Sequence, residues 1–161
     1  MNKNKDKIYI VILLFFILYV ILLFYLLFFS ESYGRTLEER KYRYNLELFK
    51  EIQRFWMYRE SLGWKTVILN LLGNIIAFMP LGFFLPVFSK IGKNCFVNVF
   101  LASFFSFLVE GIQLITRVGA FDVDDILLNT IGGFLGFVSY HIVKVIVNKK
   151  IIHNTNRRKN S

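Results

Sequence analysis

Four long apolar segments divide the chain, and polar residues collect in the connections between them. The segments span about 8–29, 67–88, 96–115 and 126–147. Each is long enough to supply the ~20 helical residues that a bilayer crossing requires. A backbone in lipid must satisfy its own hydrogen bonds, so these segments are expected to be helices. The pattern therefore predicts an all-α, polytopic membrane protein with four transmembrane helices.

The first segment resembles a secretory signal in one respect, because Lys3, Lys5 and Lys7 precede it. Its apolar run is longer than a typical signal core, however, and no small-residue cleavage pattern follows it. We therefore expect this segment to be a retained anchor helix.

The longest connection, 30–66, carries a helical pattern of its own. The stretch TLEE at 36–39 fits a capping box, in which a helix begins. Further along, apolar residues recur at helical spacing, with charged residues on the opposite face. The apolar set is Leu48, Phe49, Ile52, Phe55 and Trp56. This pattern predicts an amphipathic helix in the first outer loop, on the membrane surface or over the mouth of the bundle. The alternative is a simple tether between the first two spans.

Basic residues dominate the charge balance and indicate an orientation. The chain has 161 residues, is 55% hydrophobic and carries a formal net charge of +9. In so apolar a chain, Lys and Arg at membrane flanks suit anionic lipid headgroups, so membrane lipids rather than nucleic acid are the expected partners. The N-terminal flank, the connection 89–94 and the basic tail 148–161 are rich in Lys and Arg and poor in acids. The positive-inside rule then predicts a multi-pass protein with both termini cytoplasmic and the first and third connections external.

Polar side chains inside the apolar segments gather at one depth. In each of the last three segments they recur every three or four residues near the end predicted to be external, so each set shares one helix face. The sets are Asn70 and Asn74 in the second segment, Glu110 and Gln113 in the third with Arg117 just after it, and Asn129 in the fourth with Asp122 and Asp125 just before it, if that helix starts by Asp122. A charge at mid-membrane costs ~2.5–3.5 kcal/mol on insertion scales, so such residues require a role. We therefore predict that they line a ligand pocket open to the external side.

Three interpretations of these polar residues stay open. They are hydrogen-bonding contacts between helices, a binding pocket, or a catalytic site in which Glu110 or Asp125 acts as acid or base. Ser103, Ser106 and Thr116 have no nearby His, so a serine-hydrolase arrangement is not expected and no catalytic residue is assigned. Neither histidine has a metal-ligand pattern, and Asp122, Asp124 and Asp125 lack a cation-binding loop motif. No metal and no cofactor is therefore expected.

Proline and glycine positions predict the shape and packing of the helices. Pro80 removes a backbone donor inside the second segment and should bend it, with Gly82 just after. Gly132 and Gly136 form a small-xxx-small pair, with Gly133 between them, that would let another helix approach closely.

These residues resemble the VanZ-like family of small bacterial membrane proteins over about 45–136. The family pattern has an Asn-Leu piece before the second span, an Asn-x3-Asn-x3-Phe-x-Pro-x-Gly helix, a Glu-x-x-Gln pair, an Arg, an aspartate pair, an Asn and a Gly-Gly pair. The corresponding residues here are Asn45, Leu46, Phe49, Asn70, Asn74, Phe78, Pro80, Gly82, Glu110, Gln113, Arg117, Asp122, Asp125, Asn129, Gly132 and Gly133. One departure is Glu47-Leu48, which stands where the family has an apolar residue followed by proline.

The resemblance implies one VanZ-like membrane domain over 1–161, in the bacterial cytoplasmic membrane. It also implies a role in lowering susceptibility to glycopeptide antibiotics, teicoplanin above all. The expected ligand is then a lipoglycopeptide with its acyl tail, or a lipid-linked envelope component, bound by a protein that is not a conventional enzyme. The alternative is an intramembrane enzyme or a binding protein for an envelope lipid, without a resistance role. A transporter ranks last, because the cytoplasmic half of the spans has almost no polar residues.

Overall fold

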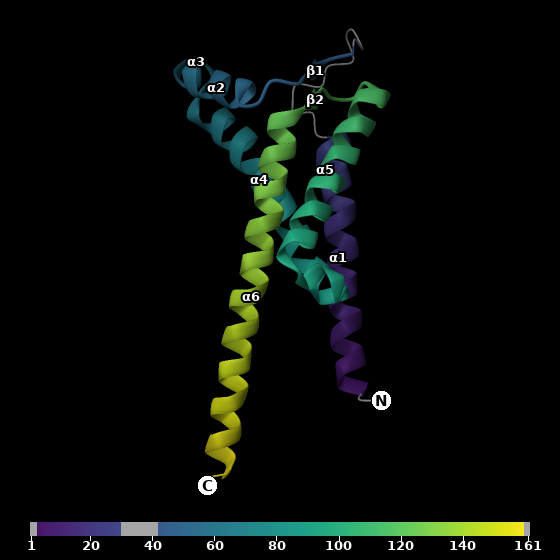
Figure 1. Ribbon diagram of the computed structural model, residues 1–161, viewed down its shortest axis with the longest axis vertical. Coiled ribbons are helices and arrows are strands. Elements are labelled where there is room, and N and C mark those ends of the chain that lie inside the picture. The colour runs from purple at the N-terminus through teal and green to yellow at the C-terminus, as the bar shows by residue number, and fades with distance from the viewer. Residues whose placement is uncertain (1–2, 30–41, 160–161) are drawn as a thin grey trace.

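Four long helices form the body of the protein (Figure 1). The computed structural model describes residues 3–29 and 42–159. In chain order the elements are α1 Lys3–Phe29, β1 Tyr44–Asn45, α2 Lys50–Met57, α3 Arg59–Leu62, α4 Trp64–Phe88, η2 Ile91–Lys93, α5 Cys95–Thr116, β2 Phe121–Asp122 and α6 Val123–Lys159. Within these described residues, the four helices α1, α4, α5 and α6 are long and apolar enough to cross a membrane. The predicted all-α, four-span fold is confirmed.

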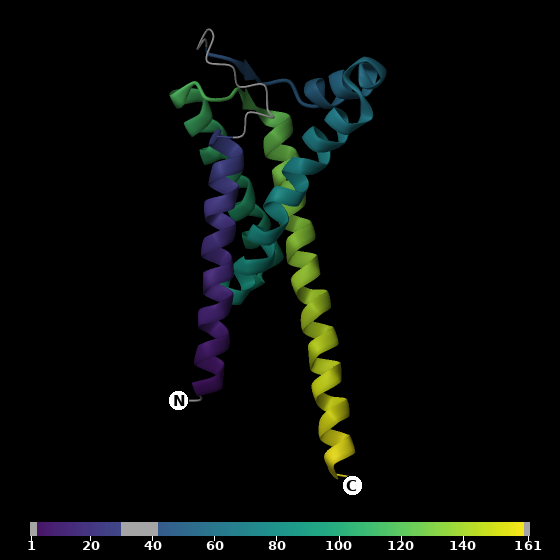
Figure 2. The ribbon, with the colours of Figure 1, turned by 180° about the vertical axis from the view of Figure 1, so that it is seen from behind.

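The two ends of the molecule differ in shape. Both chain termini lie at one end, which we call the termini end, and β1, β2, α2 and α3 gather at the other, which we call the strand end (Figures 1 and 2). Toward the termini end α1 and α6 diverge, and the connection between α4 and α5 lies between them in both views. The chain thus places its most irregular structure at the strand end, where all three spans with polar sets begin or end.

Helices α4 and α6 form the tightest packing in the fold. A Cβ on Gly82 would lie 1.8 Å from the backbone oxygen of Gly133, and a Cβ on Gly136 would lie 1.9 Å from that of Met79. A Cβ on Gly132 would also meet the α4 backbone, at 2.2 Å. No side chain fits at such distances, so the two backbones touch through glycine.

A buried amide compensates for a proline inside α4. Pro86 has no N–H and cannot donate to the carbonyl of Gly82, four residues earlier. Asn98 of α5 donates its Nδ2 to this carbonyl at 3.1 Å and to the carbonyl of Gly92 at 3.1 Å. Because both acceptors are satisfied, α4 and α5 are joined at the termini end by hydrogen bonds as well as by packing.

Helix α1 lies at the edge of the bundle. Its Tyr19 hydroxyl donates to the carbonyl of Ala77 in α4 at 2.8 Å, and the Phe16 ring packs against the rings of Phe84 and Phe88. Most of its large apolar side chains are exposed, as expected for a helix that contacts lipid on several sides.

The connections at the strand end are joined by a short parallel ladder. Tyr44 and Asn45 of β1 pair with Phe121 and Asp122 of β2. The predicted amphipathic stretch forms α2, which begins only at Lys50 and has no buried residue. The predicted capping box at 36–39 lies outside the described residues. At the other end of the chain, α6 runs to Lys159, so most of the predicted basic tail continues this helix.

Candidate functional site

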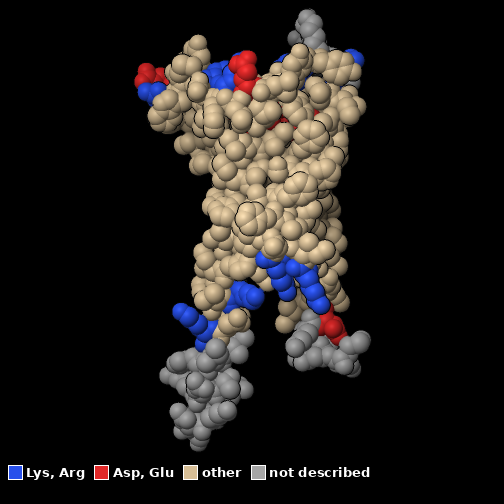
Figure 3. All heavy atoms as spheres, in the orientation of Figure 1, with Lys and Arg blue, Asp and Glu red and all other residues tan. Residues whose placement is uncertain are grey.

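A polar cavity of about 350 Å³ lies at the strand end, where α2 meets the ends of α4, α5 and α6. Its lining residues are Leu27, Arg43, Tyr44, Asn45, Glu51, Arg54, Phe55, Asn70, Asn74, Glu110, Gln113, Gly119, Ala120, Asp122 and Asp125. Six of the eight residues predicted to form a pocket line it: Asn70, Asn74, Glu110, Gln113, Asp122 and Asp125. Figure 3 shows acidic and basic side chains together at this end of the molecule. Their role toward a ligand stays a prediction.

Asp122 joins three elements at the cavity. Its Oδ1 accepts the N–H of Asp124 at 2.8 Å, which makes it the N-terminal cap of α6. The same oxygen accepts Nδ2 of Asn45 in β1 at 3.0 Å. The Asp122 N–H in turn donates to Oε2 of Glu110 in α5, at 3.1 Å. Burial raises the pKa of the Asp122 carboxyl above its ordinary value.

Amide side chains connect the spans around the cavity. Asn74 of α4 donates its Nδ2 to Oδ1 of Asp125 in α6. Gln113 of α5 donates its Nε2 to the carbonyl of Leu27 at 2.8 Å, near the end of α1. Asn70 donates to a carbonyl one turn earlier in its own helix, at 2.8 Å. Four spanning helices therefore meet through polar contacts at one depth.

Asp124 was not among the predicted pocket residues, yet it holds α2 over the cavity. Its side chain is buried, with 1% exposed. The carboxylate accepts the N–H groups of Phe49, Glu51 and Ile52, the last two at 2.8 and 3.2 Å. The first N–H groups of a helix have no partner inside the helix, and a negative charge there also complements the helix dipole. Asp124 thus caps α2 from α6.

Helix α2 and the preceding segment add charged side chains that the sequence-based set lacked. Glu51 and Arg54 line the cavity and form an ion pair, and Arg43 lines it from the residue before β1. Burial raises the pKa of Glu51, and the nearby charge of Arg54 opposes that change. The amphipathic pattern showed that α2 has a charged face, but it gave no signal of what that face would meet.

Arg117 and Asn129 do not line the cavity. Arg117 ends α5 in a left-handed conformation, with a φ of 56°. Its guanidinium lies 4.3 Å from the ring centroid of Tyr42 and donates to the Tyr42 hydroxyl at 3.1 Å. Asn129 is buried between α5 and α6 and donates its Nδ2 to Oγ of Ser106 at 2.9 Å. Both residues connect elements around the cavity.

The lining suits a polar group. Four carboxylates, two guanidinium groups and several amides supply hydrogen-bond donors and acceptors, whereas Leu27 and Phe55 are the large purely apolar side chains of the lining. Hydroxyl or amine groups of a ligand can form hydrogen bonds with these donors and acceptors. A long hydrocarbon chain cannot, so it would leave them without hydrogen-bond partners. Within the part of the chain that the structure describes, no group of three or more His, Cys, Asp and Glu is arranged to hold a metal ion.

These features define a multi-pass protein of the plasma membrane with a polar cavity at one end of four spanning helices. Residues 16–144 match the VanZ/LLP1 family, and the chain belongs to that family. It is similar to Protein VanZ of Enterococcus faecium, with 39% identity over 85 residues. That match covers 50% of this chain and 50% of the relative, so the chain spans about half the length of the curated relative it matches. No solved structure matches the chain.

Proposed function

We propose that this protein lowers the susceptibility of a bacterium to glycopeptide antibiotics, chiefly teicoplanin, through its strand-end cavity. Membership of the VanZ/LLP1 family and similarity to Protein VanZ support this role. The observation that carries the proposal is the convergence of the family-motif residues on one cavity. Those residues are Asn45, Asn70, Asn74, Glu110, Gln113, Asp122 and Asp125.

The proposal places both termini in the cytoplasm and the cavity on the external face, where envelope components and antibiotics are encountered. The described charged residues near the termini end support this orientation, because lysines outnumber acids there. They are Lys7, Lys90, Lys93, Lys144, Lys149 and Lys150, with one acid, Asp6. Positive charge favours the cytoplasmic side of a span.

The ligand is proposed to carry a polar head and an apolar tail. The head, from a lipoglycopeptide or from a lipid-linked envelope component, binds the carboxylates and amides of the cavity. Leu27, at the end of α1, borders the cavity, and α1 exposes an apolar surface from there along the bilayer. The acyl tail lies along that surface, so the cavity itself needs few apolar groups.

A second candidate is acid–base chemistry on an envelope lipid in the same cavity, with no resistance role. Glu110 favours this reading, because its side chain is only 2% exposed and still lines the cavity. A recessed carboxylate is a suitable acid or base when it lies within hydrogen-bonding reach of a substrate.

The experiment compares minimum inhibitory concentrations of teicoplanin and vancomycin in one susceptible Gram-positive host. The strains carry an empty vector, the wild-type gene, Glu110→Gln, or the control Glu60→Gln, at matched membrane levels. Glu60 lies on α3 and is exposed outside the cavity lining, so the control removes the same charge. We expect wild type and Glu60→Gln to protect against teicoplanin, with little effect on vancomycin, and Glu110→Gln to lose protection.

Binding of labelled teicoplanin to membranes distinguishes the two candidates. Loss of protection together with loss of binding supports a binding function. Loss of protection with retained binding favours chemistry at Glu110. If the wild-type protein reaches the membrane and changes neither inhibitory concentration, the resistance function is contradicted.

A further inference from the structure

A second hollow, of about 300 Å³, lies between α1, α4 and α6 on the opposite half of the molecule. Its walls are mostly apolar, with Ile12 from α1 and Phe84 and Val87 from α4 facing residues of α6. The α1 and α6 ribbons diverge toward this end of the molecule (Figures 1 and 2), and both helices contribute residues to the lining of the hollow. We call it the termini-end groove.

Aromatic contacts give this groove a fixed base. The Phe83 ring of α4 meets the Tyr140 ring of α6 edge-on, with centroids 5.9 Å apart and an interplanar angle of 81°. On the other side, Phe84 packs against Phe16 of α1, at a centroid distance of 5.3 Å. Because α4 is held by rings on both neighbours, the space between α1 and α6 is built into the packing.

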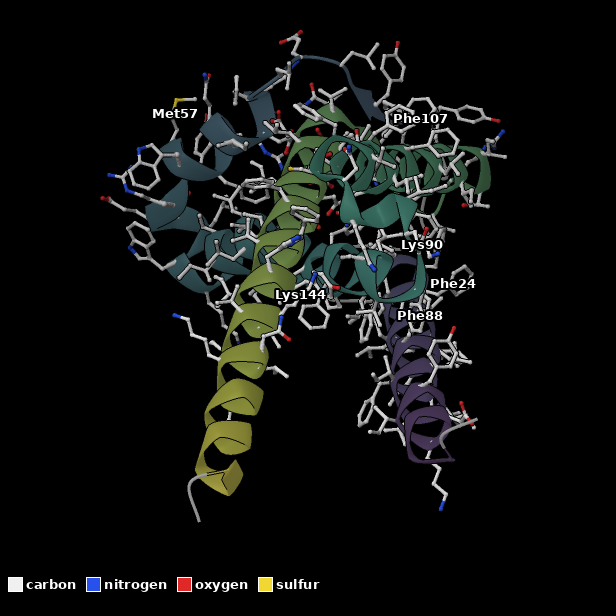
Figure 4. All side chains as sticks on the ribbon, turned by 60° about the horizontal axis from the view of Figure 1, so that its bottom comes forward. Phe24, Met57, Phe88, Lys90, Phe107 and Lys144 are labelled. Atoms are coloured by element: carbon white, nitrogen blue, oxygen red, sulfur yellow. The ribbon has the colours of Figure 1, made fainter. Side chains whose placement is uncertain are left out.

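One cation, Lys144, lies in this apolar lining. Lys144 and Asn148 are four residues apart on α6, so they occupy the same face of the helix and line the same groove. Figure 4 shows Lys144 on the side of α6 that is turned toward the ends of α4 and α5. Among the described residues, no carboxylate forms an ion pair with Lys144. Within the described part of the chain, the Lys144 ammonium group therefore has no carboxylate partner.

The surroundings of Lys144 reinforce its charge. Lys90, Lys93 and Lys149 are exposed lysines of the same end, and Asp6 is the acid described there. Figure 3 shows blue lysine side chains gathered around the notch between the two diverging helices. Long lysine side chains near the end of a span extend their charge to the headgroup region. An apolar groove that ends in cations matches a molecule with a hydrocarbon chain and an anionic head.

We propose that the termini-end groove binds one acyl chain of an anionic glycerophospholipid, with the lipid phosphate on Lys144 and Asn148. The chain lies against Ile12, Val87 and the aromatic base, and the phosphate pairs with the Lys144 ammonium group. A zwitterionic lipid fits the apolar walls but brings its own ammonium to a basic surface, so it binds more weakly. This site is separate from the strand-end cavity and does not depend on the function proposed for it.

The test measures lipid retention by the full chain purified in detergent. The protein is mixed with equal amounts of phosphatidylglycerol and phosphatidylcholine, and bound lipid is quantified by native mass spectrometry. We expect about fivefold preference for phosphatidylglycerol, the size of effect that one lysine near an anionic headgroup produces. Lys144→Gln should remove most of this preference. The control Lys93→Gln, an exposed lysine outside the groove lining, should keep it.

A second pair of variants tests the groove by shape. Val143→Trp puts a large side chain into the lining and should lower retention of both lipids. Val145→Trp, an exposed position of α6 outside the lining, should retain them. Circular dichroism and unfolding temperature identify any variant that has lost its fold. Equal retention of the two lipids by wild type, equal effects of Lys144→Gln and Lys93→Gln, or no effect of Val143→Trp would each overturn the proposal.

Discussion

Asp124 links two parts of the chain through a single carboxylate. It lies at the start of α6, and it accepts backbone N–H groups from the start of α2, more than 70 residues earlier. Since α2 has no buried residue of its own, this cap is a main contact that positions α2 over the cavity. The side chain thus sets the position of Glu51 and Arg54 in the lining.

Replacement of Asp124 by Asn should loosen α2. Asn removes the negative charge and presents an NH₂ group to the same N–H donors, so one or more of these bonds is lost. A lost cap of this kind costs about 1–2 kcal/mol, which corresponds to roughly tenfold faster exchange of the protected amides. Hydrogen–deuterium exchange of the Phe49, Glu51 and Ile52 amides measures the effect. Asp6→Asn, at an exposed position of α1, is the control, and equal exchange in the two variants would contradict the cap.

The pKa of Asp122 predicts how the stability of the strand end depends on pH. Burial raises the pKa of this carboxyl, so its ionised form costs stability in the folded state. The cost is present above the folded-state pKa and disappears as pH falls through that pKa toward the ordinary aspartate value of about 3.9. Asp122→Asn keeps an oxygen that accepts from Asn45 and Asp124 but carries no charge.

The variant should therefore unfold at a higher temperature than wild type at pH 7, and the difference should shrink as the pH is lowered. Unfolding temperatures of the two proteins in one detergent, from pH 7 to pH 4, measure this difference. A difference that stays constant or grows toward low pH would show that burial of the Asp122 charge has no such cost.

Helices α4 and α6 pair because glycine lets their backbones meet, and this contact also aligns Asn74 with Asp125 at the cavity. Gly136→Ala should disrupt it, since the added Cβ would lie 1.9 Å from the carbonyl oxygen of Met79. Overpacking of this kind costs typically about 1–3 kcal/mol. Gly111→Ala on α5 is the matched control, because its Cβ meets nothing within 4 Å and alanine favours a helix. Unfolding in detergent should show loss of stability for Gly136→Ala alone; equal stability of the two variants would mean that α6 shifts at little cost.

The spans and the depth of the polar residues could be predicted because lipid imposes simple rules. A span needs about 20 apolar residues, and polar side chains at one depth then gather at one end of the bundle. The hydrogen bond between Asn74 of α4 and Asp125 of α6 follows from this rule, because both side chains lie at that depth. Asp122 was predicted to lie on the face of α6; it precedes the helix as its cap and reaches the cavity all the same.

The positions of Arg117, Asn129 and Asp124 could not be predicted in the same way, because they depend on contacts that helical periodicity does not predict. The spacing from Gln113 to Arg117 implies a shared face only while the helix continues. Since α5 ends at Thr116, the left-handed turn directs Arg117 to Tyr42. Asn129 shares a face with Asp125, but it lies one turn deeper, where α5 closes against α6 through Ser106. The contact of Asp124 with α2 joins segments distant in the chain, and no local pattern encodes it.

The two hollows of the molecule have opposite characters that fit the two faces of one membrane. The strand-end cavity is lined by acids, amides and two arginines, and the termini-end groove is apolar with one lysine. If the strand-end cavity receives an envelope component, the strand end must be external. A groove for an anionic lipid suits the cytoplasmic leaflet, where positive residues and anionic lipids are concentrated. The orientation of the chain is therefore the point on which the functional proposal depends.

Cysteine labelling in intact cells tests this orientation. The single cysteine, Cys95, is first replaced by Ser, and either Ser61→Cys on α3 or Lys149→Cys on α6 is added; both positions are exposed. A membrane-impermeant maleimide should label Ser61→Cys in whole cells, and Lys149→Cys only after the membrane is permeabilised. The reverse pattern would place the strand-end cavity in the cytoplasm, where it meets no external glycopeptide. The proposed resistance mechanism would then fail.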